Sequence, residues 1–311
     1  MNASKFLIYF LSLTLGLISA SCGSSKKAIS YQLGLEKGDD MMYRQTQEST
    51  TRINVMGMDQ TTTNKQELEY QLRVTDIAEN KETKIETTFK NIKMDQNSAM
   101  SSLSYDSKNP EKSKSNPTAE IFDNMLGQTI EIVIDQQGNV KQVQGADALI
   151  EKMFAGMDQP EMADMKSLMK TQFGGDVFAQ SIAQLGQFYP DKAVKTGDSW
   201  TKVTKLTTPM AMEVITDYTL TGRKKGVSTI SFTSTIATDP NAEGMSFGGM
   251  SMKYDLKGKQ TGTMLVNEKS GWVNNSSGNL TMDGNMNITG AMGNMSTKMS
   301  LEQMVKFEKI R

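Results

Sequence analysis

The chain has 311 residues, with 34 Lys and Arg against 35 Asp and Glu, no His, one Cys and 25 Met. Without histidine there is no Ser-His-Asp triad, no Cys-His pair and no His-ligated zinc, and a single cysteine allows neither an internal disulfide nor a Cys-ligated cluster. The net charge of -1 gives no general attraction to nucleic acid. We therefore expect no nucleic-acid partner.

Residues 1–21 have the pattern of a secretory signal peptide. Lys5 supplies the positive charge, residues 6–18 are mostly apolar, and small residues precede Cys22. The apolar stretch is too short to span a membrane comfortably. The position of Cys22 resembles that of the acylated cysteine in bacterial lipoproteins, although Ser19 stands where those signals usually have Leu. The alternative is an ordinary secreted protein in which Cys22 has no role.

The lipoprotein interpretation predicts where the protein resides. Acyl chains on Cys22 would anchor it in the cell envelope, and residues 22–30 would form a short flexible tether. The membrane is thus an expected partner, contacted through the N-terminal lipid. No acidic run follows Cys22, which favours the periplasmic face over exposure at the cell surface.

Alternation of apolar and polar residues predicts long antiparallel strands. In residues 67–75, Leu68 and Tyr70 begin an apolar face, whereas Glu67 and Glu69 begin a face that we expect to be solvated. At the C-terminus two alternating stretches, 280–288 and 295–307, flank the glycines Gly290 and Gly293. This arrangement predicts a long hairpin with a glycine-bearing turn.

Two parts of the chain resemble each other, which indicates an internal repeat. Gly38-Asp39-Asp40 and Gly197-Asp198-Ser199 open the two parts, and Tyr70-Gln71-Leu72 corresponds to Tyr218-Thr219-Leu220. We therefore predict one β repeat over 31–145 and a second over 191–311. The alternative is that unrelated β-meanders share turn residues by chance.

The segment 146–190 between the repeats has helical spacing instead of alternation. Asp158-Gln159-Pro160-Glu161 is typical of a helix start, and Gly174-Gly175 of a helix end. The predicted fold is therefore mainly β with a helical insertion (α+β). Two antiparallel β repeats form a curved sheet or half-barrel, and helices within 146–188 cover one of its faces.

Methionines are the most unusual feature of the insertion. Thioethers fill adaptable apolar surfaces, and clusters of them can also hold Cu(I). Because many Met residues stand where the helical or strand period requires an apolar residue, we expect packing or ligand contact, with no metal and no cofactor. The predicted lining of an apolar ligand site is Met153, Phe154, Met162, Met165, Met169 and Phe178.

The stretch FYPDKAVKTGDSW, residues 188–200, carries a family resemblance. A Phe/Tyr-Pro pair followed by Gly-Asp-Ser-Trp resembles an uncharacterised family of Bacteroidota lipoproteins, to which no activity is assigned. The predicted fold has a more distant likeness to curved-sheet lipid and lipoprotein carriers of the LolA/LppX type. The alternative is structural: a tight turn at Gly197-Asp198 followed by the anchoring aromatic Trp200.

These patterns predict a protein that is not an enzyme. No two carboxylates are placed across a cleft by the sequence, and no phosphate loop or nucleotide fingerprint is present. We expect an envelope-anchored lipoprotein that binds an apolar or amphipathic ligand. The alternatives are a structural or assembly subunit that acts through protein contacts and, less favoured, a Met-based copper-binding protein.

Overall fold

Alternating sequence gives extended strands in the first half of the chain. A computed structural model describes residues 27–55, 57–99, 102–109, 119–156, 166, 188–206, 211–242, 244–247, 250–290 and 293–311. The elements of the first half are β1 (Asp40–Val55), β2 (Met58–Ile77), β3 (Thr83–Asn97), β4 (Ser102–Asp106), α1 (Ala119–Met125), β5 (Thr129–Ile134), β6 (Val140–Gln144) and α2 (Ala146–Met153).

The second half is built from strands in the same way. Its elements are β7 (Ser199–Leu206), β8 (Met212–Lys224), β9 (Val227–Thr238), β10 (Met245–Phe247), β11 (Met250–Asn267), β12 (Val273–Gly290) and β13 (Gly293–Lys309). The predicted C-terminal hairpin is confirmed, because β12 and β13 pair along their whole length up to Gly290 and Gly293. At the β8–β9 turn, Lys225 and Gly226 both have positive φ, of 51° and 75°, as a tight hairpin turn requires.

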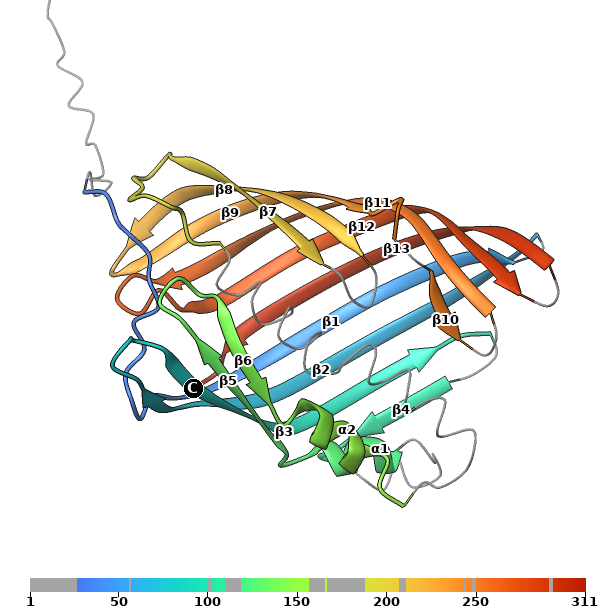
Figure 1. Cartoon of the computed structure of the whole chain (residues 1–311), viewed down its shortest axis with the longest axis horizontal. Coiled ribbons are helices and arrows are strands. Elements are labelled where there is room, and N and C mark those ends of the chain that lie inside the picture. The colour runs from blue at the N-terminus through green and yellow to red at the C-terminus, as the bar shows by residue number, and fades with distance from the viewer. Residues whose placement is uncertain are drawn as a thin grey trace, which may run out of the picture.

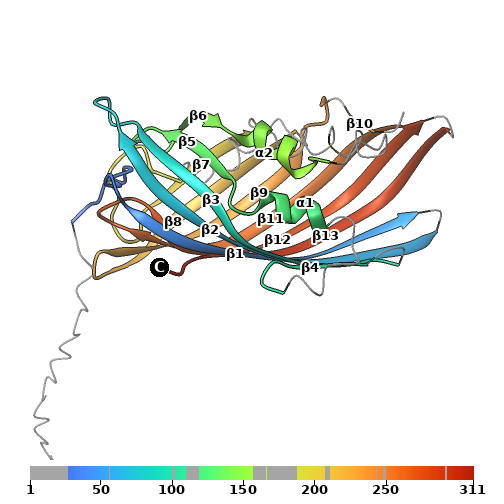
Figure 2. The same ribbon diagram turned by 90° about the horizontal axis from the view of Figure 1, so that it is seen from below.

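All the strands in the described part of the chain belong to one antiparallel sheet of 13 strands, which confirms the predicted fold class. The order along the sheet is β6-β5-β3-β2-β1-β13-β12-β11-β9-β8-β7, with β4 paired to β3 and β10 paired to β11. Figure 1 shows the sheet as a broad, twisted surface, and Figure 2 shows that it curves into a trough whose edges do not meet. The short strands β6 and β7 form these two edges.

The order of strands has the same form in the two predicted repeats. In the first repeat it is β6-β5-β3-β2-β1, and in the second it is β12-β11-β9-β8-β7. The extra strand β13 lies between β1 and β12 and so joins the two sets. This arrangement is the one that the sequence correspondences require, and the duplication itself stays a prediction.

The hydrophobic core fills one end of the trough, which we call the closed end. The N-terminal residues 27–35, here named the strap, run across it. Ile29 pairs with Val194 on one side, and the Leu33 amide donates to the Gln136 carbonyl at 2.8 Å on the other. Residues 27–30, which we predicted to be part of a flexible tether, are therefore held against the body. Tyr31, Leu33 and Leu35 of the strap are buried in the core.

The two short helices pack inside the trough (Figure 2). α2 begins where the helical insertion was predicted, and its Leu149, Ile150 and Met153 are buried in the main core. α1 was not predicted. Its Ala119 is buried in a small cluster with Ile92 of β3 and Tyr105 of β4. Most of the predicted insertion, residues 157–165 and 167–187, lies outside the described residues.

Candidate ligand-binding face

Strand register decides which side chains share a face of the sheet. Residues directly opposite each other in an antiparallel pair point to the same side. Tyr43 of β1 pairs with Tyr70 of β2, which pairs with Phe89 of β3, and all three contribute to the main core together with α2 and the strap. Because the helices lie inside the trough, this is the concave face.

The concave face is free of charge over the central strands. Following the register from Tyr43 and Tyr70, the described concave residues of β1, β2, β3, β9, β11 and β12 include no Asp, Glu, Lys or Arg. β8 adds Arg223 at the closed end, opposite Ser228, where Glu268 pairs with it at 2.8 Å. β13 adds Lys309 at the closed end, and the edge strand β7 adds Lys202, which is bonded to Asp191 at 2.5 Å. The sheet thus presents a neutral surface to the inside of the trough.

Within this neutral surface, the two halves of the sheet differ. On β1, β2 and β3 the concave side chains beyond the core are mainly polar, and six of them are amides: Gln45, Gln47, Gln60, Asn64, Gln66 and Gln96. On β8, β9, β11, β12 and β13 they are mainly apolar, and Ile236, Leu256 and Met282 form a second cluster there. Around that cluster pack Met212, Val214, Tyr254, Leu280, Met299 and Leu301, all of them partly exposed. The face is therefore amide-rich on one side and apolar on the other.

Two glycines in the apolar half leave room for an aromatic ring to lie against the sheet. Gly262 of β11 lies directly opposite Gly278 of β12, and the ring of Phe232 on β9 covers both. A Cβ at Gly262 would overlap the Phe232 ring and the carbonyl oxygen of Ser277. Close backbone approach by an aromatic ring is a known reason for glycine inside a strand.

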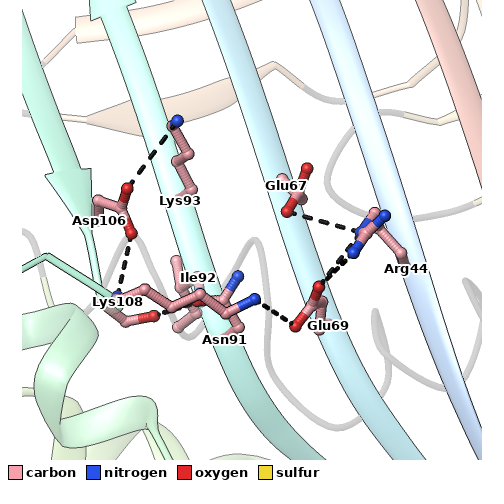
Figure 3. A network of polar contacts seen from close by, with 9 residues as sticks. Arg44, Glu67, Glu69, Asn91, Ile92, Lys93, Asp106 and Lys108 are labelled. Atoms are coloured by element: carbon pink, nitrogen blue, oxygen red, sulfur yellow. Dashed lines mark hydrogen bonds and ion pairs between the residues drawn. The ribbon is translucent and has the colours of Figure 1, made fainter.

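The convex face of the same strands carries the charges. Figure 3 shows a network in which Arg44 of β1 contacts Glu69 of β2 at 2.7 Å, and Lys108 contacts the same carboxylate at 2.9 Å. Glu67 lies 3.6 Å from Arg44. We expected Glu69 to be solvated, and this is wrong, because its side chain is only 9% exposed. The register shift between Glu69 and Tyr70 and the chain around Lys108 together enclose it.

The charge of Glu69 is stabilised where it lies. Burial alone would raise the pKa of this carboxyl group, but the hydrogen bonds from Arg44 and Lys108 outweigh burial and hold the pKa below its usual value. The network therefore stabilises the outer surface of the sheet, and its charged groups point away from the trough.

Two clefts are lined in part by charged residues. One of about 550 Å³ lies where the strap meets β7, and it includes Tyr31 and Lys202. The other, of about 510 Å³, lies where the β1–β2 and β12–β13 hairpins part beyond the Ile53–Met299 pair. Its lining includes the charged residues Arg52, Asp59, Asp283 and Lys298. Neither cleft offers a continuous apolar wall.

The structure describes only two of the six residues that were predicted to line an apolar site. Met153, the last residue of α2, and Phe154, which follows it, are each 5% exposed and belong to the main core, so they pack α2 against the core and do not line an open site. Met162, Met165, Met169 and Phe178 lie outside the described residues, as does Cys22. Sequence reasoning missed the concave face of β11 and β12, although the alternation of Leu280 and Met282 with polar residues was its signal.

The stretch that carried the family resemblance lies at the closed end. Trp200 donates its indole N–H to the Phe188 carbonyl at 2.6 Å, and the Tyr189 hydroxyl donates to the Gly271 carbonyl at 3.0 Å. Trp200 also stacks on Tyr218 at a ring distance of 5.7 Å. The Tyr189 hydrogen bond holds the segment before β7 against the β11–β12 turn, and the Trp200 hydrogen bond holds the same segment against β7.

The described residues show neither a membrane-spanning helix nor a cluster of metal ligands. None of the helices described is long and apolar enough to cross a membrane. Across the same part of the chain, no group of three or more His, Cys, Asp or Glu side chains is arranged to hold a metal ion.

Solved structures resemble this chain only at low identity. A lipovitellin structure concerned with lipid–protein interactions is 10% identical, with a TM-score of 0.48, covering 89% of this chain and 25% of that chain. An outer membrane channel from Pseudomonas putida F1 is 8% identical, with a TM-score of 0.22 and coverage of 88% and 97%. DynF from the dynemicin biosynthesis pathway of Micromonospora chersina is 8% identical, with a TM-score of 0.19 and coverage of 89% and 84%. The chain spans a quarter of the lipovitellin chain, and scores this low support no argument about function.

Sequence comparison places the chain more clearly. Curated protein sequences gave no match. The model of a family of unknown function, DUF6263, matches residues 80–273, which is more than half of the chain. The match runs from the β2–β3 turn to the first residue of β12 and includes the FYPDKAVKTGDSW stretch. The chain therefore belongs to this family of unknown function.

Proposed function

We propose that the protein is a non-enzymatic, lipid-anchored envelope protein that binds an uncharged amphiphile on the concave face of its sheet. The observation that carries this proposal is the separation of charge between the two faces. The same strands that hold Arg44, Glu67 and Glu69 outside present only neutral side chains inside. Solubility explains why the convex face is charged. It does not explain why the concave face of the same strands lacks charged side chains.

The apolar half of the face suits hydrocarbon. Leu280, Met299 and Leu301 are partly exposed beside the buried Met282, so an acyl chain laid over β11–β13 would remove further apolar surface from water. Each buried CH₂ contributes about 0.8 kcal/mol. Methionine side chains adapt to ligands of varied shape, which favours a class of related chains over one rigid molecule.

The amide-rich half suits a polar group without charge. Asn64 has a buried side-chain oxygen with no hydrogen-bond partner in the described structure. A hydrogen bond from a ligand hydroxyl or amide would remove the free-energy cost of leaving this buried acceptor without a partner. A charged headgroup would instead lose its hydration with no countercharge on the face, which costs several kcal/mol. We therefore infer a ligand with a hydroxyl- or amide-bearing head.

The anchor places this site in the envelope. Cys22 lies five positions before the first described residue, and its acylation would hold the trough beside a bilayer, at the periplasmic face. The resemblance to Bacteroidota lipoproteins supports this location. A lipid of the adjoining membrane is then a ready source of ligand.

A pair of adjacent residues on β12 offers a matched test. Leu280 faces the trough and is partly buried, whereas Thr281 is exposed on the convex side. The protein is titrated with a fluorescent monoacylglycerol and with the fatty-acid anion of the same chain. We expect tighter binding of the monoacylglycerol, a loss of at least about tenfold in Leu280→Glu, and no change in Thr281→Glu.

A second variant protects the test against misfolding. Gln66→Glu places a charge on the amide-rich half with almost no change of shape, and circular dichroism checks that each variant is folded. Gln66→Glu should also weaken monoacylglycerol binding. Absence of saturable binding to the wild type, or equal losses in Leu280→Glu and Thr281→Glu, would refute the proposed site.

A further inference from the structure

Five exposed lysines gather where the strap begins. The Lys27 carbonyl accepts a hydrogen bond from Arg223 at 2.5 Å, which places the start of the strap beside Lys224 and Lys225. The pairing of Ile29 with Val194 brings the segment with Lys192 and Lys195 to the same end of the sheet. We name the set Lys27, Lys192, Lys195, Lys224 and Lys225 the basic rim.

The charge of the basic rim is not neutralised by its neighbours. Among the described residues, no ion pair is formed by any of the five side chains. The acidic groups nearby have other partners: Asp191 is bonded to Lys202 at 2.5 Å, and Glu268 is bonded to Arg223 at 2.8 Å. Asp198 accepts from the Lys195 backbone amide at 2.8 Å and so holds its own turn. The surface around the start of the strap is therefore locally positive in a chain whose net charge is -1.

The position of the basic rim relative to Cys22 indicates its partner. Lys27 lies five positions after Cys22, and an extended chain spans at most about 18 Å over five residue steps. A lipid on Cys22 would hold the rim within one or two Debye lengths of the bilayer surface, where anionic headgroups attract lysine.

We propose that the basic rim contacts anionic lipid headgroups, so that the closed end faces the bilayer and the opposite end of the trough points away. This inference rests on the predicted lipid anchor but not on ligand binding. It explains why unpaired lysines gather at this end although the chain as a whole is almost neutral. The ligand site and the headgroup contact then lie on different surfaces of one molecule.

Lysine labelling measures this orientation directly. The protein is purified with its native N-terminus and inserted into vesicles of phosphatidylethanolamine with phosphatidylglycerol, or of phosphatidylcholine only. A water-soluble amine reagent is added, and mass spectrometry gives the labelling rate of each lysine. Lys253, Lys257 and Lys259, exposed on the convex side of β11, are internal controls. We expect the rim lysines to react about fivefold more slowly in the anionic vesicles, and the controls to react equally in both.

High salt and a matched pair of variants separate electrostatic contact from mere proximity. The protection should vanish at about 1 M salt. Replacing Lys195, Lys224 and Lys225 with Gln should abolish the protection of Lys27 and Lys192, whereas the same change at the three β11 lysines should not.

Three results would overturn the inference. The first is equal labelling of the rim in both kinds of vesicle, and the second is protection of the β11 lysines in place of the rim. The third is an N-terminal peptide without acyl mass, because the anchor is the premise. None of these results affects monoacylglycerol binding at Leu280, so the ligand site is tested separately. The third result would also remove the lipid anchor from the proposed function, whereas the first two would leave that function unchanged.

Discussion

Replacing Glu69 by Gln should destabilise the fold far more than the same change at Glu67. Both carboxylates contact Arg44, but Glu69 does so at 2.7 Å with a side chain that is 9% exposed, and it also binds Lys108 at 2.9 Å. Glu67 lies 3.6 Å away and is 33% exposed. Charge-assisted hydrogen bonds contribute about 1 kcal/mol more than neutral ones, and the exposure of Lys108 reduces its share. We expect a loss of about 1–2 kcal/mol for Glu69→Gln and less than about 0.5 kcal/mol for Glu67→Gln.

The pH dependence of this difference follows from the lowered pKa of Glu69. A carboxyl group whose pKa is lower in the folded protein stabilises it fully above the unfolded-state pKa of about 4.3, and this contribution is lost as the pH falls through the folded-state pKa. Urea unfolding of both variants at neutral and acid pH measures the effect. The cost of Glu69→Gln should be complete at pH 7 and should shrink below about pH 4. Equal losses in the two variants, or a cost that does not change with pH, would refute the reasoning.

Other substitutions test separate parts of the fold. Gly262→Ala should cost about 1–3 kcal/mol in urea unfolding, because its Cβ would overlap an aromatic ring, whereas Gly278→Ala, with its nearest atom at 3.3 Å, should cost less than about 1 kcal/mol. Arg223→Met removes the bond to the strap carbonyl and a partly buried ion pair, and it should accelerate hydrogen exchange at the Ile29 amide at least tenfold; an unchanged rate would count against the strap contact. Tyr43→Phe should cost about 0.5–1.5 kcal/mol by removing a buried hydroxyl that donates at 3.3 Å, and a stabilised variant would contradict this.

The sequence predicts strands well where one face is buried and the other solvated. The alternation in 67–75 and in 280–307 reports the two sides of one sheet directly, so β2, β12 and β13 follow from local pattern alone. Gly290 and Gly293, which stand between the two alternating stretches, indicate the turn of the β12–β13 hairpin. The curved antiparallel sheet was therefore predictable as a class.

Long-range features were not accessible to the same reasoning. The pairing of β1 with β13 joins residues more than 240 positions apart, and no local pattern specifies it. The burial of Glu69 depends on a register shift and on Lys108, which comes 39 residues later. Residues 27–30 of the strap were predicted to be part of a tether, because nothing in this short polar stretch indicates that Ile29 pairs with Val194, 165 positions later.

The predicted lining residues and the apolar face that the structure describes lie on different parts of the chain. We expected an apolar face beneath helices and named methionines of the insertion, because helical spacing is conspicuous in a sequence. The described part of the apolar face comes instead from strands of the second half, where β8 and β13 each contribute two partly exposed residues to the cluster and β11 and β12 contribute one each, such as Leu280. Only the register of the assembled sheet brings them together.

Photocrosslinking with an uncharged amphiphile tests the central claim most directly. A monoacylglycerol with a photoreactive group at the end of its acyl chain is irradiated with the protein, and the labelled residues are identified by mass spectrometry. The account predicts labels on concave residues of β11–β13, such as Leu280 and Met299, and none on their convex neighbours Thr281 and Ser300. Labels spread equally over both faces, or confined to the convex face, would contradict it.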